Sequence, residues 1–449
     1  MKLKKVDFLI RYEHKVRELE SIMLIRFELE RRGYSVEFIG NYEYKVEKNF
    51  SPKVFIYPAI YNNDDFKSDL YKYGKIKKIA NLMWEQVFTI DNETDPNFCQ
   101  NIVGIGSRAL NLCWGNQSRD RIIRGGAAPY SAIKVGQINL DLLRGKFKSA
   151  LKSKSELAHA YGIDINKRWQ LFISSFAYCD MDDLQIDLIL RMYGNEYYNN
   201  FKSISDRSRK IILDWFENSL KNNPDTIIIY RPHPDEIGKK GRLIELKNTY
   251  PNFYIISELA LKHWINASDK ILNWYSTGII DGIVLNKPWR LLRPIQIDEH
   301  YDYNLMYNAK QINDEDAFRE DFSNYNIREI IDKNLLESYY HIDQEKYSYL
   351  KICDCLEDLY RTSKYDIKYT IQESLNIFLT RLRFMIVKSI KKFAVLLIGN
   401  SLTLRIINYY KNDSNNKWMT ILDEGYEKNV INSSDIEDIE SRIKHIVYE

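Results

Sequence analysis

The chain has 449 residues, of which 45% are apolar, and its formal net charge at pH 7 is +3. A chain of this length exceeds the size at which a single hydrophobic core usually stops growing, so it predicts two domains and an additional segment. The apolar content excludes wholesale disorder, and the nearly balanced charge excludes a general nucleic-acid binder, in which basic residues would dominate.

The first part of the chain predicts one α/β domain. Residues 6–10 predict a β-strand rather than a signal peptide, because no small-residue cleavage site follows this apolar run. Residues 15–32 predict an amphipathic helix that ends at Gly33, a residue that suits a helix C-cap. Short apolar runs separated by polar stretches then predict strands at 34–39, 54–57, 79–84, 102–105 and 110–114. Strands that alternate with helices form a parallel sheet covered on both faces.

The same alternation resumes after a lysine-rich stretch at 146–155, which is expected to connect two domains. Apolar patterns predict helices at 208–222 and 278–285 and strands at 169–174, 226–230, 253–256, 270–273 and 289–292. The predicted fold class is therefore α/β, with two Rossmann-like domains that face a cleft, residues 1–145 and 146–335, and a C-terminal helical extension.

The extension begins with a helix expected at 339–361, in a segment (336–365) that is predicted to pack back on the first domain. In residues 366–449 the composition changes, and in the region 370–411 acids are nearly absent. Its basic residues are Arg381, Arg383, Lys388, Lys391, Lys392, Arg405 and Lys411, interleaved with Phe378, Leu382, Met385, Ile386, Phe393 and Leu397. The tail at 412–449 is polar, and the sequence assigns it no function.

A basic amphipathic pattern of this kind is typical of helices at a membrane surface. Each basic residue near anionic lipid contributes roughly 1 kcal/mol, which favours membrane contact for the region 370–411. The alternative is a helix that packs on the domains and leaves a solvated basic face. No stretch reaches the roughly 18 apolar residues that span a bilayer. The five scattered cysteines (Cys99, Cys113, Cys179, Cys353 and Cys355) predict free thiols in a reducing compartment rather than a disulfide framework or a metal clip.

The strongest chemical signal is the segment IIIYRPHPDE at 227–236. A buried strand leads directly into an Arg-Pro-His-Pro sequence, the RPHP loop (231–234), at the carboxyl end where α/β sheets bind ligands. Arg231 can grip a phosphate with two hydrogen bonds, and His233 can bond a phosphate oxygen or protonate a leaving group. The alternative is a turn histidine bonded to its own loop.

A second signal follows the strand expected at 270–273. There Ser276, Thr277 and Gly278 precede a helix, whose free N–H groups together with the two hydroxyls predict a phosphate cradle. Helix capping by the hydroxyls is the compatible alternative. Asp281, one turn further, faces either the cleft or solvent. Since neither a Walker lysine nor a GxGxxG sequence is present, an NTPase or a dinucleotide-binding protein is a weak interpretation.

In the first domain, Glu13 and His14 follow the first strand, and Glu85 follows the strand at 79–84. Each could accept a proton from an acceptor hydroxyl. The alternative is that Glu13 favours the helix start and that Arg17 and Glu18 are structural charges. A cluster of acids at 180–183 predicts a helix start rather than a metal site.

These motifs occur in an order that resembles the bacterial surface carbohydrate biosynthesis proteins, over residues 6–361. The order comprises EHKVREL at 13–19, WG at 114–115, VG at 135–136, DLL at 141–143, a strand at 171–174, the RPHP loop, YSTG at 275–278, Asp281 and NKP at 286–288. The phosphate loops also resemble those of CDP-glycerol glycerophosphotransferases and of capsule Kdo- and sialic acid-type transferases. Two departures are QINLD at 137–141, where relatives carry Asn-Pro-Arg-Phe-Asp, and Trp274 before Tyr275, where the glycerophosphotransferases carry Asp.

The resemblance implies a GT-B glycosyltransferase with a nucleotide-linked donor, in which the second domain binds the donor and the first binds a glycan or lipid-linked glycan acceptor. It implies donor phosphate ligands at Arg231, His233, Ser276 and Thr277, to which we add Gly278 and Asp281. We expect metal independence, no cofactor, and a peripheral position on the cytoplasmic face of the membrane, in capsule or lipopolysaccharide synthesis. The alternatives are a CDP-polyol phosphotransferase and a non-catalytic glycan- or nucleotide-binding scaffold.

Overall fold

A computed structural model of the chain describes residues 4–41, 50–181, 183–234, 236, 241–326, 329, 331–398 and 425–449. The chain divides into two compact units. Unit 1 comprises Met1–Gln86, Gln100–Ile138 and His341–Glu449, and unit 2 comprises Val87–Cys99 and Asn139–Tyr340. Within the described residues each unit contains one six-stranded sheet in which every pair of neighbouring strands is parallel.

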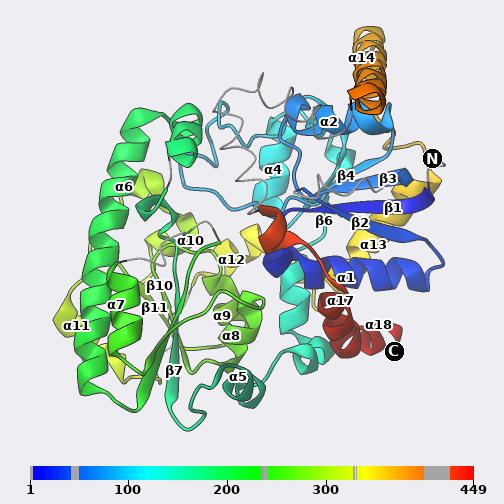
Figure 1. The fold of residues 1–449 in the computed structure, drawn as a ribbon. Coiled ribbons are helices and arrows are strands. Elements are labelled where there is room, and N and C mark those ends of the chain that lie inside the picture. The colour runs from blue at the N-terminus through cyan, green and yellow to red at the C-terminus, as the bar shows by residue number, and fades with distance from the viewer. Residues whose placement is uncertain are drawn as a thin grey trace. The chain divides into compact units, whose positions relative to one another are not determined.

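The sheet of unit 1, of which β1, β2, β3, β4 and β6 are labelled in Figure 1, has the strand order β2-β1-β3-β4-β5-β6. Its strands are β1 Lys4–Tyr12, β2 Val36–Gly40, β3 Phe50–Tyr57, β4 Ile79–Asn81, β5 Leu110–Cys113 and β6 Ala132–Lys134. Its helical segments are α1 Lys15–Arg31, α2 Asn63–Tyr73, α3 Ile105–Arg108, α4 Asn116–Arg124, η1 Pro129–Ser131, α13 Ser348–Arg361, α14 Ile371–Ile398, α17 Ser433–Ile439, η6 Glu440–Lys444 and α18 His445–Tyr448.

The sheet of unit 2 has the order β12-β11-β10-β7-β8-β9. Its strands are β7 Arg168–Ile173, β8 Thr226–Arg231, β9 Phe253–Ile255, β10 Lys270–Asn273, β11 Trp289–Leu292 and β12 Gln311–Ile312. Its helical segments are η2 Ile138–Leu143 (whose first residue belongs to unit 1), η3 Gly145–Ala150, α5 Lys154–Tyr161, η4 Ala177–Cys179, α6 Asp183–Asn222, α7 Arg242–Thr249, α8 Leu261–Ala267, α9 Ile279–Val284, η5 Glu299–Tyr301, α10 Asn304–Tyr307, α11 Glu315–Phe322 and α12 Lys333–Tyr339.

The central strands of both sheets are buried along nearly their whole length. All six residues of β8 are buried, and in β1 the run from Phe8 to Ile10 has no exposed surface. A strand covered on both faces needs apolar residues in sequence rather than in alternation, and these are the runs from which the strands were predicted. The α/β fold class with two Rossmann-like domains is confirmed.

The strand expected at 102–105 is a wrong prediction. Ile102 and Ile105 are buried, but Gly104 between them has a φ of 59°, so the chain turns there and α3 begins at Ile105. The Asn63 side-chain oxygen accepts the Ile105 N–H at 2.8 Å and lies where a Cβ on Gly104 would be. Burial of apolar residues alone does not distinguish a short strand from a turn that packs into the core.

The helix expected at 339–361 forms only from Ser348 onward, as α13, because the preceding helix α12 ends at Tyr339. Between them the Asp343 carboxylate accepts the N–H groups of Glu345 and Lys346, at 2.8 and 3.2 Å, and this turn competes with helical hydrogen bonding. Helix α6 is longer than expected, because it starts at Asp183 instead of residue 208. Within it Gly194 has a φ of 83°, outside the helical region.

Helix α13 packs on α1 and β3 of unit 1. The chain returns to this unit at His341, whose N–H donates to the Trp114 carbonyl at 3.0 Å. Gly136 passes so close to this segment that a Cβ would lie 2.5 Å from both the His341 carbonyl oxygen and the Ser348 hydroxyl. The WG and VG motifs of the sequence therefore fix the return of the chain.

Helix α14 contacts α2 through Ile377, which is buried. Of the basic region 370–411, residues 399–411, with Arg405 and Lys411, lie outside the described part of the chain, as do the side chains of Lys388, Lys391, Lys392, Phe393 and Leu397 and residues 412–424 of the polar tail. Among the helices that the structure describes, none combines the length and the apolar character needed to cross a membrane.

Candidate functional site

The two phosphate-loop candidates emerge at the same edge of the unit 2 sheet. Strand β7 pairs with β10 on one side and with β8 on the other, all in parallel. The carboxyl ends of parallel strands meet at one edge, which is where ligands bind in sheets of this type. β8 leads into the RPHP loop, β10 leads into the hydroxyl loop (276–278), and Ser174 follows β7 between them.

The RPHP loop is closed by a buried carboxylate that the sequence did not single out, that of Glu236. It accepts hydrogen bonds from the Ser174 hydroxyl at 2.5 Å, the Tyr230 hydroxyl at 2.6 Å and the His233 N–H at 3.1 Å. Burial, followed by the charge of Glu236, raises the pKa of Tyr230 well above its ordinary value, so the phenol remains a donor. The path of the loop around His233 is therefore set by three donors that converge on one acid.

Arg209 of α6 lies beside this acid. Its guanidinium is 3.6 Å from the Glu236 carboxylate and 2.7 Å from that of Asp180. The positive charge offsets part of the cost of burying Glu236. Asp180 is thus ion-paired, and α6 begins at Asp183, as the sequence predicts.

Arg231 contacts protein carbonyls. Its guanidinium donates to the backbone oxygens of Glu258 and Leu259, in the loop between β9 and α8. Leu259 has a φ of 62°, a region that a leucine rarely adopts, so these bonds hold a strained turn. Burial lowers the pKa of Arg231 to about 10. In this structure Arg231 orders a neighbouring loop, and its role as a phosphate ligand stays a prediction.

The hydroxyl loop is a tight turn after β10. The Asn273 side chain accepts the Ser276 N–H at 3.0 Å, and the Ser276 hydroxyl oxygen accepts the Gly278 N–H at 3.1 Å. Ser276 therefore closes a local turn and does not cap the helix, because Gly278 is the N-cap of α9 and no side chain makes a capping bond there. Within the part of the chain that the structure describes, the Thr277 hydroxyl makes no hydrogen bond, which leaves it able to bond a ligand. A Cβ on Gly278 would lie 2.6 Å from the end of the Leu261 side chain, which would have to shift to accept it.

Asp281 lies in the first turn of α9. Burial raises its pKa to about 6, and the positive charge of Lys262 on α8 opposes this rise. A carboxyl group that changes its charge near pH 6 can donate a hydrogen bond below that pH and repels a phosphate above it.

In unit 1 two of the three expected proton acceptors, Glu13 and Glu85, lie around one guanidinium together with Glu18. Arg17 is 2.6 Å from Glu85, 3.1 Å from Glu18 and 3.8 Å from Glu13. Burial would lower the pKa of Arg17, but these carboxylates raise it above its ordinary value. The ends of β1 and β4 are therefore joined by an ion-paired cluster.

Glu18, which the sequence analysis gave as a possible structural charge, is fully buried. It accepts the N–H groups of Glu13 and His14, at 2.9 and 3.1 Å. Burial raises its pKa, against the effect of Arg17. His14 occupies the N-cap position of α1, but its side chain makes no capping bond there. The loop that carries Glu13 and His14 is thus shaped by Glu18.

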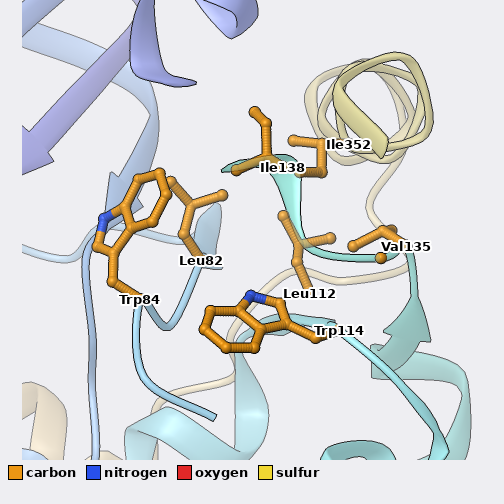
Figure 2. A pocket seen from close by; sticks show the side chains of 8 residues that line it. Leu82, Trp84, Leu112, Trp114, Val135, Ile138 and Ile352 are labelled. Atoms are coloured by element: carbon orange, nitrogen blue, oxygen red, sulfur yellow. The ribbon is translucent and has the colours of Figure 1, made fainter. Parts of the chain in front are cut away.

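Gln86 is a buried side chain that fixes the loop after β4. Its amide donates to the carbonyls of Leu82, Met83 and Leu112, and its oxygen accepts the Trp114 N–H at 2.8 Å. The neighbouring cavity of about 10 Å³ has room for about one water molecule. Figure 2 shows the apolar side chains around it, Leu82, Trp84, Leu112, Trp114, Val135, Ile138 and Ile352. This cavity is a packing space rather than a substrate site.

Sequence reasoning missed Glu236, Ser174 and Tyr230, and it placed Gln86 beside the candidate Glu85 without assigning it a role. The signal for Glu236 was present, since an acid three residues after a loop histidine can accept its N–H. The others become visible only when strands distant in sequence are paired. The described cysteines are free thiols, and in the described part of the chain no three His, Cys, Asp or Glu side chains group as a metal site; metal independence stays a prediction.

Comparisons with known proteins place the fold. No protein-family model matches the chain, and no curated protein matches it. The structure is similar to that of a variant of the wall teichoic acid polymerase TagF soaked with CDPG, with a TM-score of 0.51 and 13% identity over 80% of this chain and 89% of that one. At this identity the similarity establishes a shared fold, and it confirms the predicted GT-B-like pair of Rossmann-like domains.

Two UDP-GlcNAc 2-epimerases are also similar at lower scores. That of Methanocaldococcus jannaschii, in complex with UDP-GlcNAc and UDP, has a TM-score of 0.47 and 12% identity over 79% of this chain and 99% of that one. That of Neisseria meningitidis, bound to UDP-GlcNAc, has a TM-score of 0.42 and 12% identity over 79% of this chain and 100% of that one.

Proposed function

We propose that the chain is a glycosyltransferase that moves a sugar from a nucleotide-activated donor, CMP- or another NDP-sugar, to a growing cell-surface polysaccharide such as a capsule or an O-antigen. The observation that carries the proposal is the emergence of the RPHP loop and the hydroxyl loop at one edge of the unit 2 sheet. The RPHP loop brings an imidazole and the hydroxyl loop brings the Thr277 hydroxyl, groups that bond phosphate oxygens, whereas the N–H groups of His233, Ser276 and Gly278 are bonded within the loops.

In this proposal unit 2 binds the donor. His233 and Thr277 donate to the phosphate oxygens, where negative charge builds as the nucleotide leaves, and Gly278 lets the phosphate approach the backbone. Ser276 shapes the turn through its bond to the Gly278 N–H. Asp281 makes donor binding dependent on pH, because its pKa is raised to about 6.

Unit 1 binds the acceptor glycan in this proposal, and one of its loop residues takes the proton of the attacking hydroxyl. Glu85 and Glu13 are both paired with Arg17, which fixes their orientation and occupies them. We therefore place His14 in the role of the base, with Glu13 and Glu85 as the supporting charges.

The experiment that tests the function is a thermal-shift panel of CMP, CDP, UDP, GDP and ADP, because a ligand that binds only the folded state raises the apparent stability. We expect one nucleotide to raise the Tm of the wild type and not that of His233→Ala. The matched control is His159→Ala, an exposed histidine on α5 of the same unit, which should keep the shift. An equal shift in His233→Ala would contradict the proposed site.

Transfer of a polyol phosphate is the second candidate, since the TagF structure soaked with CDPG has the same fold. The product decides between the two: polyol phosphate transfer leaves phosphorus in it, which ³¹P NMR detects, whereas glycosyl transfer does not. The third candidate, a non-catalytic scaffold, predicts no turnover in the wild type.

We further propose that the chain works on the inner face of the cytoplasmic membrane, with α14 on anionic lipid. Large apolar side chains of this helix are exposed, by 90% at Ile371 and by 44–61% at Leu375, Phe378, Leu379, Leu382, Met385 and Ile386. At 3.6 residues per turn these seven residues, the apolar stripe, share an arc of about 120°, opposite the buried Ile377. Arg381 and Arg383 flank the stripe on its two sides.

A further inference from the structure

The polar tail of the chain packs along α1 of unit 1. Helices η6 and α18 contact α1, and Ile443, Ile446 and Val447 are buried there. Arg442 forms an ion pair with Glu20 of α1 at 2.6 Å, with both side chains largely buried. A segment docked through apolar side chains and a shielded ion pair has a defined position.

The same segment reaches the N-terminus of α1. Asn429 accepts the backbone N–H of Lys15 at 3.0 Å, and its amide group donates to the Gly425 carbonyl at 3.0 Å. The Lys15 ammonium forms an ion pair with Asp435 at 3.1 Å. Lys15 is the first residue of α1, directly after His14.

These contacts matter because the first N–H groups of a helix have no partner within it. Glu18 accepts the N–H groups of Glu13 and His14 from inside α1, and Asn429 accepts the next one, that of Lys15, from outside. The backbone of residues 13–15 is thus held from two sides. One of the two acceptors, Asn429, belongs to the C-terminal end of the chain.

We propose that Asn429 and Asp435 are positioning residues that fix the His14 loop for acceptor deprotonation. The inference rests on the proposed function, in which His14 takes the acceptor proton. It gives the polar tail a role that its composition does not indicate. Since these residues belong to unit 1 and the donor phosphate loops to unit 2, their loss lowers kcat and leaves the KM for the donor unchanged.

The test compares Asn429→Ala with Asn429→Asp, which keeps an acceptor for the Lys15 N–H, and with Ser441→Ala, whose hydroxyl bonds within the tail at 2.8 Å. We expect Asn429→Ala to lower kcat about tenfold, the effect of a small misplacement of a reacting group, with the donor KM within about twofold. Asn429→Asp and Ser441→Ala should keep most of the wild-type kcat.

Hydrogen exchange of the peptide that covers residues 13–18 provides a readout without turnover. It should quicken in Asn429→Ala and remain unchanged in both other variants. Unchanged exchange and kcat in Asn429→Ala would overturn the inference, as would an equal loss in Asn429→Asp. If the wild type shows no turnover but Asn429→Ala still quickens this exchange, the proposed function is contradicted, whereas the contact of Asn429 with the His14 loop is supported.

Discussion

The backbone N–H of His233 donates to the Glu236 carboxylate at 3.1 Å, and the backbone N–H of Glu236 donates to the His233 carbonyl at 2.9 Å. This reciprocal pair closes the RPHP loop on itself. Because the same carboxylate also accepts the hydroxyls of Ser174 and Tyr230, the loop is attached to the ends of both β7 and β8. The position of His233 therefore depends on one buried acid.

Replacing Glu236 with Gln should disturb both stability and donor binding. The glutamine amide offers one acceptor oxygen and two donors in place of a carboxylate, so at least one of the three converging donors loses its acceptor. A buried donor left without a partner costs about 1–3 kcal/mol. Urea unfolding should show a loss of this size, and the nucleotide that stabilises the wild type should bind more weakly. Glu245→Gln, at an exposed position of α7, is the control and should change neither; wild-type values in Glu236→Gln would show that the carboxylate does not set the loop.

Arg231→Lys separates two roles for this side chain. If the guanidinium orders the turn at Leu259, the lysine, which cannot reach both carbonyls in the same way, should lower the free energy of unfolding by about 1–3 kcal/mol without any nucleotide. The matched control is Arg168→Lys at the start of β7, whose side chain is 62% exposed. If instead Arg231→Lys unfolds like the wild type but loses nucleotide binding, Arg231 is a phosphate ligand and our interpretation of its contacts is wrong.

The sequence predicts the larger elements of this fold because of how they are buried. β8 is covered on both faces, so its apolar run is continuous. The sequence therefore predicts where β8 ends and where the RPHP loop begins. By contrast β6 and β12 have only three and two residues, too few for a recognisable pattern. The contacts of Arg231 with Glu258 and Leu259 join segments more than twenty residues apart, and nothing in the RPHP sequence indicates them.

The docking of the tail was beyond sequence reasoning for a similar reason. Ile439, Ile443 and Ile446 are buried on unit 1, but they lie in a segment dominated by polar residues, and the partner of Arg442 is Glu20, at the other end of the chain. The composition of a segment indicates only how polar the segment is. It does not report which distant helix offers a complementary face.

Asp281 should make stability depend on pH. Its pKa rises from 3.8 in the unfolded chain to about 6 in the folded one because of burial. Between these values the folded state holds a proton that the unfolded state has released, so the free energy of unfolding falls as the pH rises from about 4 to about 6 and is level above that range. In urea unfolding between pH 4 and pH 8, the free energy of unfolding of the wild type should fall relative to that of Asp281→Asn as the pH rises from about 4 to about 6, because the other carboxyls with shifted pKa values, such as Glu18, are common to both proteins. Identical pH profiles in both proteins would contradict it.

The apolar stripe of α14 should bind anionic vesicles. Full burial of one large apolar side chain contributes about 1.5–3 kcal/mol, and the basic residues add electrostatic attraction to anionic lipid. In sedimentation with phosphatidylserine-containing vesicles, Phe378→Ser with Met385→Ser should lower the bound fraction at least about fivefold. Raised salt should weaken binding of the wild type, because the flanking Arg381 and Arg383 are screened.

The control for the loss of an exposed apolar residue is Ile165→Ser in unit 2, where the isoleucine is 44% exposed and lies away from α14 in the sequence. It should leave vesicle binding unchanged. The alternative occupant of the stripe is a second copy of the chain. Residues 374–411 contain seven basic and no acidic residues, so two copies of this region would repel each other, which disfavours self-association. A wild type that elutes as a dimer and becomes monomeric in Phe378→Ser with Met385→Ser would assign the stripe to self-association. Sedimentation that is equal with neutral and anionic vesicles would instead contradict the proposed preference for anionic lipid, because charge would then have no part in recognition.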